Sequence, residues 1–105
     1  MNDENNNENL LERLTNDIDD AKWDLLKPHH EREALFMITE ELELAAVGFT
    51  MARDEVEYIK KWLADEQMFR PTDEQIGTWE QENTEFQYLI VQPYVLVKIK
   101  REGLN

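Results

Sequence analysis

The segment from residue 86 to residue 100 constrains the fold most, because it carries the clearest strand pattern in the chain. Two apolar runs rich in β-branched residues, 89–91 and 95–97, flank the sequence Gln92-Pro93-Tyr94. Over residues 95–100 apolar side chains alternate with Lys98 and Lys100, which is the two-residue period of a strand. Pro93 has no N–H for a sheet ladder, so it marks a bulge, a sheet edge or a break between two strands.

The residues before this segment show mostly helical spacing. An apolar stripe recurs at intervals of three and four residues: Leu11, Leu14, Ile18, Ala21 and Leu25. This stripe predicts a helix that breaks near Asp19-Asp20, where Asp20 caps a second short helix. The second helix should end at Lys27, because Pro28 disfavours helical backbone at the residue before it. The apolar run 34–38 has the length of a buried strand.

Three polar residues are placed to begin further helices. Thr39 precedes two glutamates, and Asp54 and Thr72 each begin a sequence of capping-box form. The helix expected after Asp54 carries an apolar stripe, which consists of Val56, Ile59, Trp62 and Leu63. The sum predicts an α+β fold, with about four short helices packed on a two- to three-stranded sheet made from residues 34–38 and 87–100.

We expect one domain, because a chain of 105 residues buries a single modest core. Residues 1–9 contain five asparagines and three acids, with no apolar residue after Met1. Such a segment has nothing to bury, so we predict a disordered lead-in over 1–9 and a single α+β domain over 10–105.

The composition excludes several classes of chemistry. Without cysteine there are no disulfides, thiolate nucleophiles or cysteine-based metal sites, and without serine there is no Ser-His-Asp triad. The three glycines are far apart, whereas a phosphate-binding loop needs them clustered. No stretch approaches the roughly 20 apolar residues of a membrane span, and the acidic N-terminus does not resemble a signal peptide. We therefore expect a cytoplasmic protein with no cofactor.

The chain is strongly acidic, with 24 Asp and Glu against 11 Lys and Arg and a net charge of −13. Nucleic acids and anionic membranes are bound mainly through Lys and Arg, so we expect neither as a direct partner. Residues 86–105 are the exception, with one acid and three bases. There Tyr94, Lys98, Lys100 and Arg101 form a candidate partner-binding surface. Either this strand contacts an acidic partner or pairs with a second copy, or it is an edge strand that its lysines protect from aggregation.

His29 and His30, with Glu31 and Glu33 nearby, most resemble metal ligands. Adjacent histidines point in different directions, and a helix would bring only His29 and Glu33 to one face. We therefore predict a polar turn and no metal centre. Close carboxylate pairs are inevitable among 24 acids, and they indicate no catalytic residue.

Several motifs resemble those of a known family: Trp23, Leu42-Glu43-Leu44, Trp62-Leu63 at the end of a helix that begins at Asp54, Arg70-Pro71-Thr72, Trp79 and the ending Ile-Val-Gln-Pro-Tyr-Val-Leu-Val at 90–97. The chain is similar to the bacterial proteins catalogued as domain of unknown function 2288, over residues 10–98. After Val97 it departs from the family pattern, because lysines and an arginine stand where glutamine and an acid are expected. The resemblance implies a compact bacterial cytosolic protein and carries no activity or catalytic residue.

These observations predict a non-enzymatic interaction or regulatory protein that docks on a larger protein partner. The alternative is a metabolite binder or minor enzyme with a pocket between sheet and helices, lined by Trp23, Trp62, Trp79 or the histidines. The position of the tryptophans on or near apolar stripes favours a core role over a ligand cage. A third reading, a nucleic-acid mimic that inhibits a nucleic-acid-binding protein, requires acids along one face, whereas they are spread over several predicted helices.

Overall fold

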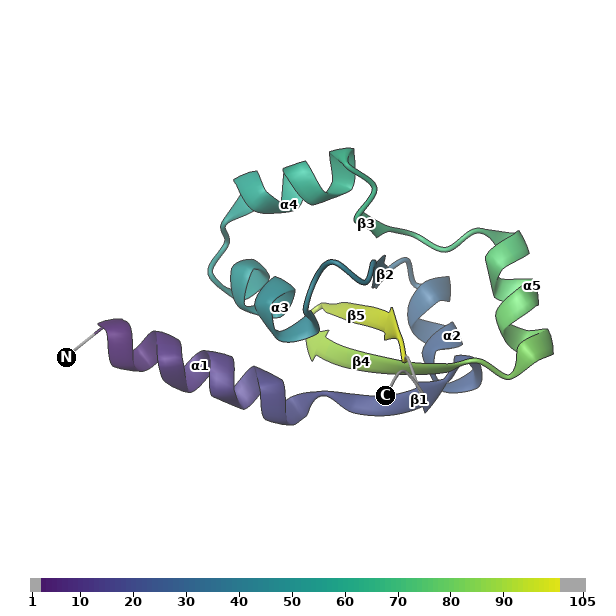
Figure 1. Cartoon of the computed structure of the whole chain (residues 1–105), viewed down its shortest axis with the longest axis horizontal. Helices are drawn as coiled ribbons and strands as arrows, with labels where there is room; N and C mark the ends of the chain where they lie inside the picture. Colours follow the sequence, from purple (N-terminus) through teal and green to yellow (C-terminus); the bar gives the residue numbers. More distant parts are fainter. Residues whose placement is uncertain (1–2, 101–105) are drawn as a thin grey trace.

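The computed structural model describes residues 3–100, which form five helices and one five-stranded sheet (Figure 1). The helices are α1 (Asp3–Asp17), α2 (Trp23–Glu31), α3 (Leu44–Ala52), α4 (Val56–Ala64) and α5 (Asp73–Glu82). The strands are β1 (Asp19–Lys22), β2 (Leu35–Ile38), β3 (Met68–Phe69), β4 (Glu85–Val91) and β5 (Tyr94–Ile99). The α+β class is confirmed, but the prediction of about four helices and two to three strands underestimated the number of elements.

Residues 86–100 form the antiparallel pair β4 and β5, so Pro93 separates two strands. The sheet order is β1-β4-β5-β2-β3, which places β5 in the centre. The interpretation of β5 as an edge strand is therefore wrong. Strand β5 is central because β2, from the apolar run 34–38, pairs in parallel with it on the side away from β4. Leu35 lies opposite Val95 and Met37 opposite Val97.

Helices cover both faces of this sheet. On one face α2 and α5 contribute Trp23, Leu26 and Trp79 to a core with Phe86 and Val97. On the other face α3 packs against the strands through a second core of Ile38, Leu44, Val47, Met68 and Leu96. Because both faces are covered, the three successive residues 95–97 are all buried. Figure 1 shows α4 beyond α3, at the β3 edge of the sheet.

The N-terminal part differs from the prediction at two places. Residues 19–22 form β1, and Asp20 caps no helix, because these residues pair with β4 from Asp19–Tyr88 to Lys22–Glu85. Helix α2 continues through Pro28 to Glu31. Pro28 has no N–H to donate to the Asp24 carbonyl, but its own carbonyl accepts the Arg32 N–H at 3.2 Å.

One of the three predicted helix starts is confirmed. Thr72 begins α5 with both halves of a capping box, because its Oγ1 accepts from the Gln75 N–H and its own N–H donates to Gln75 Oε1. The helices expected after Thr39 and Asp54 are present, but neither residue caps one, because α3 begins at Leu44 and α4 at Val56. Thr39 instead closes a turn by accepting the Leu42 N–H at 3.2 Å, and Asp54, at φ 60°, lies in the reversal between α3 and α4.

The backbone of residues 3–9 forms the first turns of α1, whereas the composition predicts a lead-in without order. Met1 and Asn2 lie outside the described residues. Leu14 is the first buried residue among the described side chains. The boundary at residue 10 stays a prediction.

Candidate functional site

The predicted partner-binding residues do not gather at one place. Tyr94 is the first residue of β5, whereas Lys98 lies near its other end and Lys100 directly follows it. Lys98 Nζ donates to the Leu42 carbonyl at 2.6 Å, and Lys100 Nζ lies 2.8 Å from Asp20 Oδ2. Lys98 thus contacts the turn before α3, and Lys100 contacts strand β1. Arg101 lies outside the described residues, and a docking role for this group stays a prediction.

The tryptophans are not assembled into a cage. Trp23 and Trp79 are buried in the core, with ring centroids 5.5 Å apart, and Trp62 is half-buried on α4. The hollow that Trp23 and Trp79 line has a volume of about 100 Å³. Ordinary small-molecule sites occupy roughly 300–1,000 Å³, so this hollow is too small for a metabolite.

The histidines form the last turn of α2. His29 Nδ1 lies 2.6 Å from an Arg32 guanidinium nitrogen, and the His30 ring packs on Trp23 at 5.7 Å between centroids. Glu33 lies past the helix end at φ 62° and does not continue the helical face of His29. Within residues 3–100, no group of three or more histidine, aspartate or glutamate side chains is placed to hold a metal ion.

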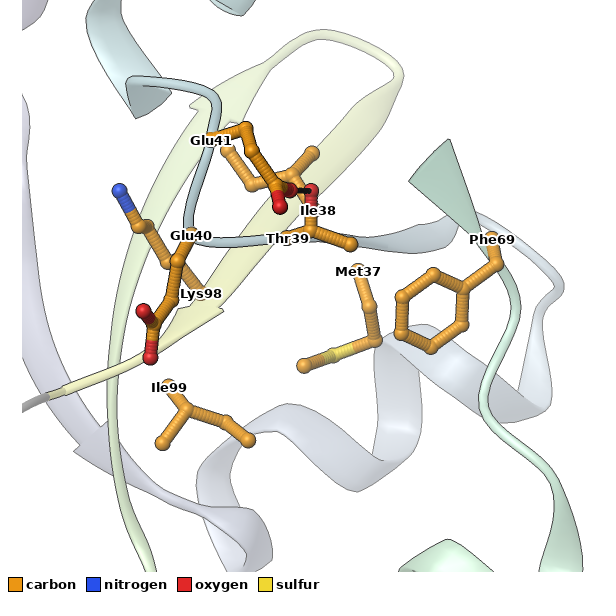
Figure 2. A pocket seen from close by; sticks show the side chains of 8 residues that line it. All are labelled: Met37, Ile38, Thr39, Glu40, Glu41, Phe69, Lys98 and Ile99. Carbon is orange, nitrogen blue, oxygen red and sulfur yellow. Dashed lines mark hydrogen bonds between the residues drawn. The ribbon is translucent and has the colours of Figure 1, made fainter. Parts of the chain in front are cut away.

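A first hollow, of about 380 Å³, lies where the parallel strands β2 and β5 end (Figure 2). Met37, Phe69 and Ile99 form its apolar wall. Its polar side chains are mostly engaged within the protein: Thr39 Oγ1 donates to the Glu41 carboxylate, which keeps the pKa of that carboxyl below its usual value, and the Lys98 ammonium points away toward Leu42. This hollow therefore offers a ligand few available polar groups.

A larger groove, of about 530 Å³, lies between the end of α3, helix α4, Arg70 and the β4–β5 turn. We call it the α4 groove. Most of its lining is apolar and includes Met51, Ile59, Leu63, Met68 and Tyr94. Large apolar grooves with a few polar groups are the usual form of a binding site.

Helix α4 is the unusual wall of this groove, because none of its residues is buried. The predicted stripe is present, but only Ile59 and Trp62 pack against the second core. Val56, Tyr58 and Leu63 are 49%, 58% and 43% exposed. An amphipathic helix usually buries its apolar face, so α4 presents apolar surface that the described chain does not cover.

Arg70 is the basic residue of the groove, and it was not among the predicted site residues. Its guanidinium lies over the Phe36 ring, 4.5 Å from the centroid. Its Nη1 donates to the Glu33 carbonyl at 2.8 Å. Both contacts join segments far apart in the chain, so no local sequence signal could have predicted them.

Comparison with known proteins gives a family and a fold. A family model described as "Protein of unknown function (DUF2288)" matches residues 9–99. The NMR solution structure of PA1075 from Pseudomonas aeruginosa superposes with a TM-score of 0.77, covering 92% of this chain and 90% of that one at 21% identity. No curated protein matches the chain. Among the described residues, no helix is long and apolar enough to cross a membrane.

Proposed function

Because the chain belongs to the DUF2288 family of proteins of unknown function, we propose from its own geometry that it is a non-enzymatic interaction protein. It docks on a larger protein partner by accepting an apolar segment of that partner in the α4 groove. The single observation that carries this proposal is helix α4, which is amphipathic and yet contains no buried residue. We place this docking in the cytoplasm.

The exposed apolar residues support a protein as the occupant. Val56, Leu63 and Tyr94 are exposed and line the groove, whereas Tyr58 lies beside Trp62 on another side of α4, with 6.3 Å between the ring centroids. Val56 and Leu63 are two helical turns apart, roughly 10 Å along α4, so a partner segment laid in the groove would cover both together with Tyr94. Apolar grooves of this kind accept the apolar side chains of a helix or an extended peptide.

A small apolar metabolite is the second candidate occupant, and the groove volume favours it. About 530 Å³ lies within the usual range of small-molecule sites. The exposed apolar stripe, however, runs from Val56 to Leu63 along α4, and a protein segment follows such a length better than a compact ligand does.

We expect Leu63→Glu to weaken docking strongly while leaving the fold intact. A carboxylate in the groove must lose its hydration when an apolar segment covers it, so partner binding should weaken by about tenfold or more. Stability should change by less than about 0.5 kcal/mol, because Leu63 is 43% exposed. The measurement is the quantity of partner retained from native lysate by the two immobilised proteins, together with their thermal unfolding.

Leu25→Glu is the matched control, because Leu25 is 53% exposed on α2 and outside the groove. It adds the same charge and should retain the partner. Equal loss in both variants would attribute the effect to added charge, and equal retention would contradict docking in the α4 groove.

A further inference from the structure

Resting on the proposed function, we infer that the docked partner segment carries one carboxylate beside its apolar side chains, and that Arg70 binds this carboxylate. The acid is an aspartate or glutamate side chain or the C-terminus of the partner. Arg70 thereby determines the register and the specificity of docking.

The guanidinium of Arg70 is held in place from two sides. The Phe36 ring supports its face, and the Glu33 carbonyl accepts from Nη1. A guanidinium carries five N–H donors in one plane, and stacking on an aromatic face leaves its edges able to donate. A carboxylate can therefore meet two parallel N–H groups without any rearrangement of the side chain.

Four cations, Lys22, Arg53, Lys61 and Lys100, lie within 4.0 Å of a carboxylate. Arg70 is not among them, and its place as the basic residue of the α4 groove sets it apart from the other cations. In the part of the chain that the structure describes, no carboxylate of the protein lies that close to Arg70. In a protein with 24 acidic residues, this arginine is fixed by an aromatic ring and a carbonyl and retains its capacity for an acid.

The surroundings of Arg70 favour a single acid. An apolar occupant excludes water from the groove, which strengthens an arginine–carboxylate contact inside it. Asp54 also lines the groove, and the whole chain carries a charge of −13. A segment with several acids would be repelled, whereas one acid placed at Arg70 would be bound.

The inference is tested by selecting peptides from a displayed random library with free C-termini on the wild-type protein. Some selected peptides should bind the wild-type protein but not the Leu63→Glu variant. These peptides should combine apolar residues with one acidic side chain, or should need a free C-terminal carboxylate to bind. Changing that acid to its amide in a synthetic peptide should weaken binding by about tenfold, as measured by fluorescence titration. Arg70→Gln should weaken the acidic peptide equally and remove the difference between acid and amide.

Arg53→Gln is the control for Arg70→Gln. Arg53 also lies over an aromatic ring, 5.4 Å from the Phe49 centroid, but its Nε is 3.2 Å from Glu55 and it does not line the groove. We expect no change in peptide affinity. The acid-to-amide comparison uses the wild-type protein, so it decides the question even if Arg70→Gln does not fold.

The possible failures are distinguishable. Groove-binding peptides that lack an acid, or that lose no affinity as amides, would overturn this inference and leave the proposed function standing. If no selected peptide is sensitive to Leu63→Glu, the proposed function fails as well. Dodecanoate serves as a free apolar carboxylate. If dodecanoate binds more tightly than every peptide, and if Leu63→Glu and Arg70→Gln both weaken its binding, a peptide is not the occupant of the groove.

Discussion

Leu26→Ala is expected to lower the free energy of unfolding by about 2–5 kcal/mol, whereas the same change at the adjacent Leu25 lowers it by less than about 0.5 kcal/mol. Leu26 is 0% exposed and packs in the core with Trp23, and Leu25 is 53% exposed on the same helix. The truncation leaves a cavity between α2 and the sheet that surrounding side chains fill only in part. Urea denaturation of the two variants and the wild type measures the difference.

The adjacent pair isolates packing from helix propensity, because both substitutions replace leucine with alanine on one helix. The total stability of a small domain is about 5–15 kcal/mol, so Leu26→Ala removes a large share of it. Equal destabilisation by both variants would contradict the placement of α2 on the sheet.

Gly48→Val is expected to lower the free energy of unfolding by about 1–3 kcal/mol. A Cβ added at Gly48 would lie 2.8 Å from Leu89 Cδ2 and 3.2 Å from Val91 Cγ2, so α3 approaches β4 more closely than a larger side chain allows. The variant must shift α3 or displace the strand side chains beneath it. Because Met51 of α3 lines the groove, peptide binding should weaken too.

Gly77→Val is the control for this substitution. Gly77 lies on α5, and a Cβ added there would meet no atom within 4 Å, so its replacement should change stability by less than about 0.5 kcal/mol. A Gly48→Val protein as stable as Gly77→Val would contradict the close contact of α3 with the sheet. Urea denaturation again measures both.

The parts of the fold that local pattern determines were predicted well. The capping box at Thr72 needs only its own four residues, and the strand character of residues 86–100 is encoded in the alternation and the β-branched runs, although their pattern left open whether Pro93 separates two strands. The stripe on α4 was also evident, although the sequence could not show that it is left largely uncovered. The family was predicted from motifs and is confirmed by the match over residues 9–99.

The parts that failed depend on contacts between distant residues. Asp19–Lys22 has no strand pattern of its own and becomes β1 because β4 offers a pairing edge. Thr39 begins no helix, and the turn that follows it is held by a distant residue, because Lys98 Nζ donates to the Leu42 carbonyl. Strand β3 has only two residues, too few for any period to be visible.

The candidate site shows the same division. Tyr94 was predicted as a binding residue and lines the groove, whereas Lys98 and Lys100 contact other parts of the chain. Arg70 was missed because its position depends on Phe36 and Glu33, more than thirty residues earlier in the chain. An acidic partner was expected at Lys98 and Lys100, whereas we infer the contact with an acid at Arg70.

The central claim, docking of a partner protein in the α4 groove, is tested most directly by photo-crosslinking. A benzophenone amino acid replaces Tyr94, which lines the groove, or Leu25, which lies outside it, and each protein is irradiated in native lysate. Docking in the groove predicts one dominant protein adduct from position 94 that is absent from position 25 and is lost when Leu63→Glu is added. No adduct from position 94, or the same adducts from both positions, would contradict it.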